Sequence, residues 1–182
     1  MVTFVRHPPP AVAPGVCYGR ADLRAPLPPA AELDALAAAL PGATRLATSP
    51  LGRCADLAAA LAPRLGLGPV LDPRLAEIDF GAWEMRAWDD IPRHEIDAWA
   101  ADVAGARPHG GESVRQMTER LAAFLADCEG HDVIAVTHQG AIRCAHAALG
   151  LSGALEMRVP FCGIVTLPSG PAHQPPDARR RR

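Results

Sequence analysis

Short runs of strand-forming residues alternate along this chain with longer segments of helical periodicity. The strand-like runs lie at residues 2–5, 45–48, 69–71, 133–136 and 164–167. Apolar residues at helical spacing lie between them, at residues 30–40, 50–65, 113–128 and 141–149. The run at 133–136 is apolar throughout, which is typical of a parallel strand buried on both faces. This alternation predicts an α/β fold, a three-layer α/β/α sandwich with a mostly parallel central sheet.

Several helix boundaries carry local signals. Ser49 is expected to cap a helix whose first position is Pro50, and Ser113 with Gln116 forms a capping box before the next apolar stripe. The acidic, tryptophan-bearing stretch at 82–101 is broken at Pro92, which predicts two short helices. Residues 1–167 are expected to form one domain, followed at 168–182 by a disordered tail rich in proline and arginine.

Composition excludes several classes of protein. With 182 residues, of which 49% are hydrophobic and 21% charged, the chain can bury a core without disulfides or a structural metal. The five cysteines are scattered and odd in number, which predicts free thiols in a reducing compartment. A net charge of -2 argues against nucleic-acid binding through bulk charge. No apolar run approaches the roughly 20 residues of a membrane span, and no signal peptide is visible, so a soluble, cytoplasmic protein is expected.

Candidate chemistry lies at the ends of two strand-like runs. Arg6 and His7 follow the first run, and His138 follows the run at 133–136. In parallel sheets, ligands bind beyond the carboxyl ends of strands. A solvent-facing loop would explain Arg6 and His7 alone, but a second histidine at an equivalent strand end favours a shared anion site. Arg53, in the first turn of a helix, would add a guanidinium where the helix dipole already favours an anion.

An acidic residue for proton transfer is less well defined by the residues alone. Glu77 lies in the segment RLAEIDFGAWE, where apolar neighbours would raise its pKa. Asp79 and Glu84 are rivals for this role, and spacing does not choose among the three. All 18 basic residues are arginine, so a phosphate would be held by guanidinium groups. No spacing typical of metal ligands is visible, since His131 and His138 lie seven residues apart across a strand, and no metal or cofactor is expected.

Five motifs in a fixed order resemble the histidine phosphatase (phosphoglycerate mutase-like) superfamily. They are Arg6-His7, TSPLGR at 48–53, LAEIDFGAWE at 75–84, GGES at 110–113 and VTHQG at 136–140. The segment GVCYGRADL at 15–23 and the stretch from FGAWE to GGES are most similar to the α-ribazole phosphatase branch. The resemblance implies that His7 is the nucleophile, that Arg6, Arg53 and His138 bind the phosphoryl group, and that Glu77 is the general acid.

The implied function is a metal-independent phosphomonoesterase that forms a phosphohistidine on a small phosphorylated metabolite. The resemblance suggests α-ribazole 5′-phosphate, of cobalamin biosynthesis, as that substrate. The alternatives are a phosphoglycerate mutase and a weakly active protein that binds a phosphorylated ligand. The sequence does not determine the oligomeric state, and a homodimer is one expectation.

Two departures from the family pattern concern the predicted site. The family usually has glycine after the first histidine, and this chain has Pro8, which removes one backbone N–H donor. Arg20 is expected to compensate as a substrate or phosphate contact. Gln139 stands where glycine or alanine often follows the second histidine, and it is expected to line the pocket.

Overall fold

A five-stranded sheet forms the centre of the protein. The computed structural model describes residues 1–154 and 156–170. The strands are β1 (Val2–Arg6), β2 (Arg45–Thr48), β3 (Pro69–Leu71), β4 (Val133–Thr137) and β5 (Ile164–Leu167). Their order in the sheet is β3-β2-β4-β1-β5, and all pairs are parallel except β5, which runs antiparallel to β1. All five predicted strands are present, and the sheet is mostly parallel, as predicted.

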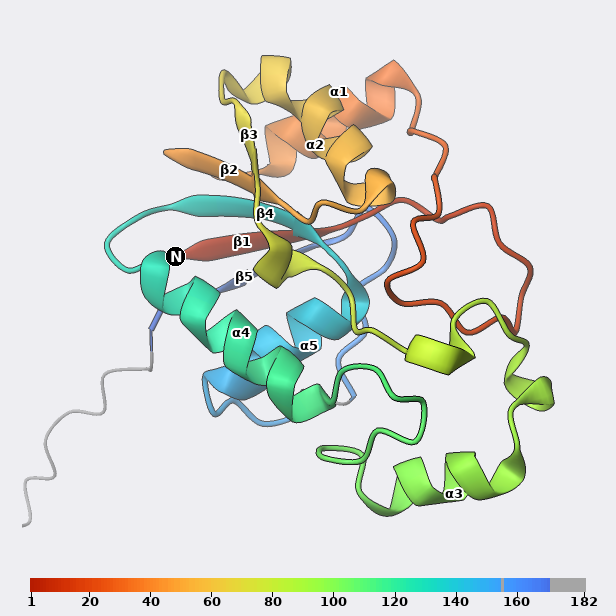
Figure 1. Ribbon diagram of the computed structural model, residues 1–182. Helices are drawn as coiled ribbons and strands as arrows, with labels where there is room; N and C mark the ends of the chain where they lie inside the picture. Colours follow the sequence, from red (N-terminus) through yellow and green to blue (C-terminus); the bar gives the residue numbers. More distant parts are fainter. Residues whose placement is uncertain (155, 171–182) are drawn as a thin grey trace, which may run out of the picture.

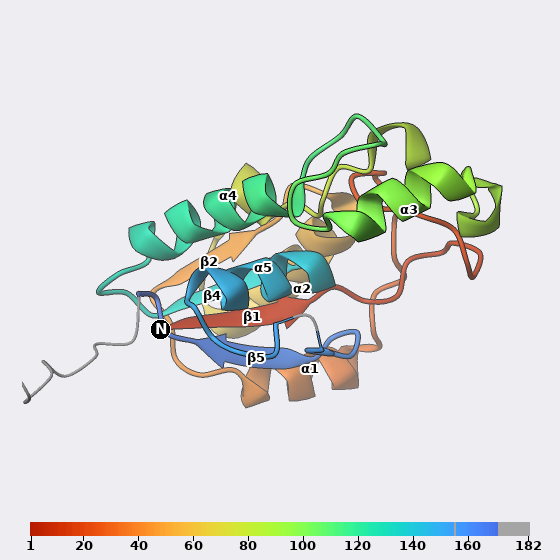
Figure 2. The ribbon, with the colours of Figure 1, turned by 90° about the horizontal axis from the view of Figure 1, so that it is seen from below.

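Helices cover both faces of this sheet. They are α1 (Ala30–Ala39), α2 (Gly52–Leu65), α3 (Arg93–Ala101), α4 (Val114–Asp127) and α5 (Gln139–Ala148). Helices α1 and α2 lie on one face, and α4 and α5 lie on the other (Figure 1). Helix α3 lies away from the sheet, beyond the end of α4 (Figure 2). The predicted three-layer α/β/α sandwich is therefore confirmed.

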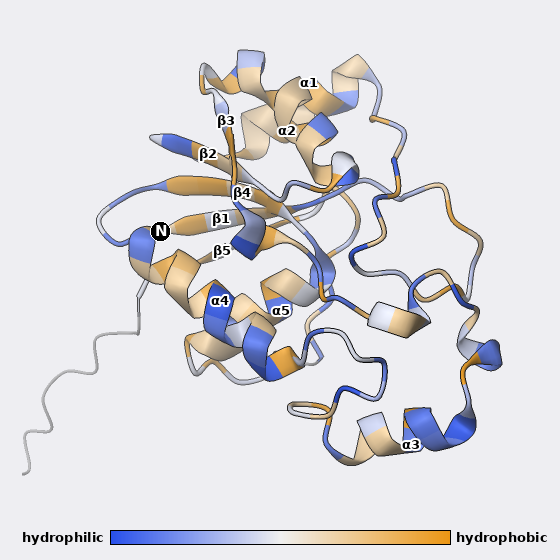
Figure 3. Cartoon of the chain, in the orientation of Figure 1, coloured by the Kyte–Doolittle hydropathy of each residue, from blue (hydrophilic) through white to orange (hydrophobic). Residues whose placement is uncertain are grey.

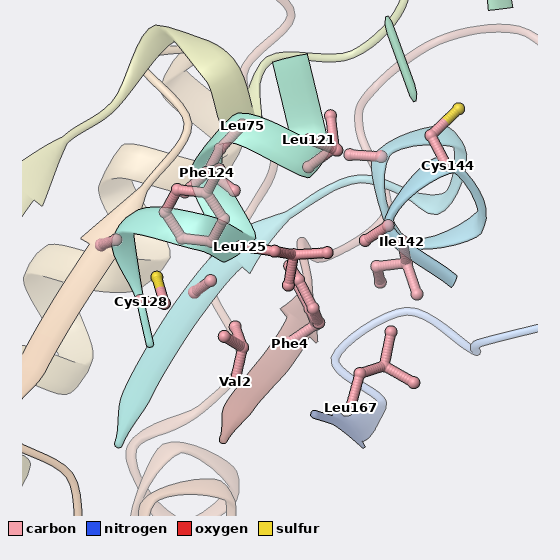
Figure 4. Close-up of a cluster of buried hydrophobic side chains, with 14 of the residues drawn as sticks. Val2, Phe4, Leu75, Leu121, Phe124, Leu125, Cys128, Ile142, Cys144 and Leu167 are labelled. Atoms are coloured by element: carbon pink, nitrogen blue, oxygen red, sulfur yellow. The ribbon is translucent and has the colours of Figure 1, made fainter. Parts of the chain in front are cut away.

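Alternation of side chains along the strands builds two hydrophobic cores. Val2 and Phe4 of β1 join the core beneath α4 and α5, whereas Val5 joins the core beneath α1 and α2. Figure 4 shows the first core, in which Phe4 lies near Phe124 and Ile142. Strand β4 is buried along its whole length, as its continuous apolar sequence predicts. Its hydrophobic colour in Figure 3 marks the centre of the molecule.

The structure corrects the predicted start of α2. Helix α2 begins at Gly52, with Leu51 in the N-cap position, so Ser49 is not its cap and Pro50 is not its first residue. The carboxylate of Asp22 accepts the Gly52 N–H at 2.6 Å. A distant loop therefore supplies the capping group that the prediction placed next to the helix.

Other boundaries differ less. Helix α5 begins at Gln139, two residues earlier than predicted, and the capping box of Ser113 and Gln116 is present as predicted. Two short helices are predicted for the stretch at 82–101, but only its second part forms an α-helix, α3, which begins directly after Pro92. The part before Pro92 contains two 3₁₀ turns, at Gly81–Trp83 and Trp88–Asp90, in place of the first predicted helix.

The remaining sequence predictions concern the cysteines, the membrane and the tail. All five cysteines are free thiols, and four are buried. Within residues 1–154 and 156–170, none of the helices is long and apolar enough to cross a membrane. The predicted disordered tail lies, from residue 171 onward, outside the described residues.

Candidate active site

Strand register brings His7 and His138 together. In the parallel pair β1–β4, Arg6 lies opposite Thr137, so the next residue of each strand is a histidine at the same sheet edge. The His7 amide donates to the Thr137 carbonyl at 3.0 Å, and the two imidazole centroids are 5.0 Å apart. Both side chains are buried, with exposed fractions of 2% for His7 and 0% for His138. Two imidazoles therefore face each other beyond the carboxyl ends of the central strands.

Hydrogen bonding fixes the tautomer of His7. Its Nδ1 lies 2.6 Å from the Pro8 carbonyl oxygen. A carbonyl oxygen only accepts, so Nδ1 carries the hydrogen and Nε2 keeps its lone pair. Burial lowers the pKa of His7 to about 3; the charges of Arg53 and Arg6 act in the same direction, and the bond to Pro8 opposes them. His7 is thus a neutral imidazole at neutral pH, with Nε2 free to act as a nucleophile.

This neutral histidine makes stability pH-dependent. The pKa of His7 is about 3 in the folded chain, against 6.5 as its ordinary value. Because the pKa is lower in the folded chain, neutral His7 contributes fully to stability above the ordinary pKa. This contribution is lost progressively as the pH falls from the ordinary pKa toward the pKa in the folded chain. Between about pH 7 and about pH 5, protonation of the unfolded chain at His7 should lower the free energy of unfolding by about 2 kcal/mol.

Urea titrations of the wild type and of His7→Gln at both pH values measure this contribution. The variant should lose less stability on acidification, by the amount that His7 supplies. His138, which is also buried and neutral, titrates in both proteins and cancels from the comparison. An identical loss in the two proteins would contradict the depressed pKa of His7.

His138 is held by groups that lie before and within α2. Its Nε2 lies 2.8 Å from the Ser49 hydroxyl oxygen and 3.4 Å from the Cys54 sulfur. Burial lowers its pKa well below the ordinary value, and the charge of Arg53 adds to this effect. Sequence reasoning missed this role of Ser49 because a serine before a helix is typical of a cap.

The guanidinium groups of Arg6 and Arg53 both donate to backbone carbonyls, Arg6 from a partly buried side chain and Arg53 from a fully buried one. Arg6 donates through Nη1 to the Val159 carbonyl at 2.7 Å, and its guanidinium lies 3.9 Å from the Phe161 ring centre. Arg53 is 0% exposed. Among the described residues, the Nε atoms of both arginines are buried without a hydrogen-bond partner. Unpaired buried donors are rare and costly, so each of these two N–H groups is available to donate to an acceptor.

Phe161 was not found by sequence reasoning. Its ring centre lies 5.6 Å from that of His7 as well as under the Arg6 guanidinium. It belongs to a segment without a motif, so no local signal connected it to the two strand ends.

Glu77 lies next to the amino end of α5. Its Oε2 accepts the Gly140 amide and its Oε1 accepts the Ile78 amide, both at 3.1 Å. Burial raises its pKa, against the opposing effects of these two amides and of Arg53. A Cβ at position 140 would lie 2.2 Å from Oε1, so glycine is what lets the helix approach this carboxylate. A carboxyl group with a raised pKa can hold a proton for a leaving group.

The rival carboxylates support loop structure. Asp79 accepts the Gly81 amide at 2.7 Å. Glu84 accepts four backbone amides, which come from residues 19, 20, 21 and 80. Contacts to this many amides fix the backbone of two segments, and they favour Glu77 as the acid among the three candidates.

Arg20 and Gln139 both contact neighbouring segments of the chain. The Arg20 guanidinium lies 3.8 Å from Glu112, and its side chain is 44% exposed. Gln139 donates to the Met157 carbonyl at 3.2 Å and accepts the Val159 amide at 2.9 Å. Both ends of the Gln139 amide are therefore occupied, and they brace the segment whose Val159 carbonyl holds Arg6. Within residues 1–154 and 156–170, no cluster of three or more His, Cys, Asp or Glu residues could hold a metal.

The site at the carboxyl ends of the parallel strands combines two buried imidazoles, the guanidiniums of Arg6 and Arg53, and a carboxyl group with a raised pKa. This set of groups defines a phosphoryl-transfer type of site. Residues 2–169 match the histidine phosphatase superfamily (branch 1), and the chain belongs to this superfamily. The resemblance stated from the five motifs is confirmed.

Curated relatives include proteins named probable phosphoglycerate mutase GpmB. The chain is 34% identical over 127 residues to the protein of Enterobacter sp. (strain 638) and 33% identical over 127 residues to that of Klebsiella pneumoniae subsp. pneumoniae. Each alignment covers 65% of this chain and 59% of the relative, so less than two thirds of the relatives' length is matched.

Solved structures share the fold over most of their length. The protein TTHB049 from Thermus thermophilus superimposes with a TM-score of 0.69 at 30% identity, covering 90% of both chains. A mycobacterial glucosyl-3-phosphoglycerate phosphatase, in a structure described as a complex with VO3, gives a TM-score of 0.75 at 25% identity, again over 90% of both chains.

Proposed function

We propose that this protein is a phosphomonoesterase that transfers the phosphoryl group of its substrate to His7. The observation that carries the proposal is the pair of buried Nε–H groups of Arg6 and Arg53, unpartnered among the described residues, beside two neutral imidazoles. A phosphoryl group supplies the acceptor oxygens that such donors lack. Arg6, Arg53 and His138 bind these oxygens and stabilise the charge of the transition state.

In the first step, His7 Nε2 attacks phosphorus while the bond between phosphorus and the ester oxygen breaks. Glu77, whose pKa is raised by burial, acts as the general acid and gives a proton to the departing oxygen. In the second step, water attacks the phosphohistidine, the Glu77 carboxylate takes a proton from this water, and the P–N bond breaks. Inorganic phosphate and the starting enzyme result, so each turnover consumes one water.

For the substrate we propose a small phosphorylated metabolite, with α-ribazole 5′-phosphate as the specific candidate. This finer proposal depends on the similarity of the segments at 15–23 and 80–113 to the α-ribazole phosphatase branch. A panel of phosphomonoesters tests it, with α-ribazole 5′-phosphate, 3-phosphoglycerate and glucosyl-3-phosphoglycerate compared by kcat/KM. A preference for either phosphoglycerate ester would overturn it.

The names of the curated relatives favour a second candidate, a phosphoglycerate mutase. A mutase returns the phosphoryl group to the substrate, whereas a phosphatase gives it to water. Incubation with 3-phosphoglycerate separates the two, because a mutase produces 2-phosphoglycerate and our proposal requires that inorganic phosphate be released from the preferred substrate.

Turnover is expected to survive metal chelation. Guanidinium and imidazole groups surround the proposed phosphoryl position, so the charge of the transition state is stabilised without Mg²⁺. Hydrolysis of p-nitrophenyl phosphate should therefore continue at an unchanged rate in excess EDTA. Loss of activity that a divalent metal restores would contradict the proposed mechanism.

A further inference from the structure

Glu84 binds the backbone of the loop at residues 19–21 with unusual completeness. Its Oε2 accepts the amides of Gly19 and Ala21, both at 3.0 Å, and its Oε1 accepts the amide of Arg20 at 2.9 Å. The fourth amide, also at 2.9 Å on Oε1, comes from Phe80. A carboxylate offers about four acceptor positions, so Glu84 is saturated by backbone donors.

Arg53 binds the carbonyl groups of the same loop. Its Nη2 donates to the Gly19 carbonyl at 2.6 Å and its Nη1 to the Ala21 carbonyl at 2.8 Å. The loop thus lies between a carboxylate that accepts its N–H groups and a guanidinium that donates to its C=O groups. The peptide unit between Gly19 and Arg20 contacts both charges, since its C=O accepts from Arg53 and its N–H donates to Glu84. The two charges polarise this unit in the same direction, which strengthens both hydrogen bonds.

Neighbouring contacts leave this loop little freedom to move. A Cβ on Gly19 would lie 2.0 Å from the Ile78 carbonyl oxygen, so the loop packs directly against the backbone beside Glu77. The same loop continues into Asp22, which caps α2 one residue before Arg53. The position of the Arg53 guanidinium is therefore set from the loop side by carbonyls that Glu84 holds in place.

We propose that Glu84 is a positioning residue for phosphate binding, which acts on Arg53 through the loop at 19–21. This inference rests on the proposed function, in which the Nε–H of Arg53, unpartnered among the described residues, binds a phosphoryl oxygen. Without the carboxylate, the loop amides lose their acceptors, the Gly19 and Ala21 carbonyls rotate, and the Arg53 guanidinium loses its fixed orientation. Glu84 touches no reacting atom in this mechanism.

Glu84→Gln is the direct test, because the amide keeps the size of the side chain but turns one acceptor oxygen into a donor that faces backbone donors. The control is Glu95→Gln, which removes one carboxylate from the same region. Glu95 accepts the Trp83 indole N–H at 2.6 Å rather than an amide of the loop. Binding of inorganic phosphate, measured by calorimetry, should weaken roughly tenfold in Glu84→Gln, as expected for coupled residues in one network, and stay unchanged in the control.

A double-mutant cycle with Arg53→Lys separates positioning from a general loss of stability. If Glu84 acts through Arg53, adding Glu84→Gln to Arg53→Lys should weaken phosphate binding by less than about twofold. The inference would be overturned if the weakening of phosphate binding in the double variant equalled the product of the two single-variant effects. It would also be overturned if folded Glu84→Gln bound phosphate as tightly as the wild type. Glu84→Asp, which keeps the charge and shortens the reach, gives the same cycle if the glutamine variant does not fold.

The outcomes also distinguish this inference from the proposed function. Wild-type protein that binds phosphate but does not hydrolyse p-nitrophenyl phosphate would overturn the proposed function, while the cycle would still measure the coupling of Glu84 to Arg53. If the wild-type protein is active but the effects of Glu84→Gln and Arg53→Lys on the free energy of phosphate binding are additive, only the positioning role is overturned.

Discussion

Replacing His7 with alanine is expected to reduce turnover on the order of 10⁴-fold or more, because the variant lacks the atom that accepts the phosphoryl group. His7 lies at the end of β1 rather than within either hydrophobic core, so the fold should survive. Rapid quenching of the wild type during turnover should trap a phosphoprotein that is stable in base and labile in acid. The variant should form none.

His131→Ala is the matched control, because it removes an exposed histidine that lies before β4. Its activity and its phosphoprotein should equal those of the wild type. Circular dichroism of both variants checks the fold. Turnover of His7→Ala at the wild-type rate would rule out the phosphohistidine mechanism.

Replacing Glu77 with glutamine is expected to slow the hydrolysis of alkyl phosphates by roughly 10²-fold or more, the usual contribution of general acid catalysis. Alkoxides are poor leaving groups and need the proton that Glu77 holds. p-Nitrophenolate leaves without one, so formation of the phosphohistidine from p-nitrophenyl phosphate should be affected much less. The comparison is made on the pre-steady-state burst, because Glu77 also activates water in the second step.

Asp79→Asn is the control for this experiment, since Asp79 is a second carboxylate two residues away and bonds the Gly81 amide. It should show no dependence on the leaving group. Glu84→Gln should weaken phosphate binding equally for both kinds of ester. A leaving-group effect in Asp79→Asn or Glu84→Gln, and none in Glu77→Gln, would show that Glu77 is not the acid.

Local sequence was sufficient for the sheet and for the two histidines. Strand-forming runs and helical stripes are properties of short segments, so the five strands and the capping box of Ser113 could be predicted. Parallel strands end at one edge, and this rule alone placed His7 near His138. The order of the five motifs then identified the superfamily, because each motif is a short local pattern.

Tertiary structure decided the roles that depend on contacts between distant segments. Ser49 resembles a helix cap in the sequence, yet its hydroxyl meets His138 in the fold, and Asp22 takes over the cap of α2. Likewise, three carboxylates between residues 77 and 84 have similar local surroundings. Only the fold places the amides of residues 19–21 on Glu84 and the start of α5 on Glu77.

The sequence by itself determined the α/β architecture, the sheet edge where the two histidines meet and the superfamily. The tertiary structure alone decided which carboxylate contacts the start of α5 and how Arg53 is held in place. The physical reason is that backbone propensity and hydrophobic period act over a few residues. The pKa of a side chain and the direction of a guanidinium depend instead on dipoles and charges that folding brings from elsewhere in the chain.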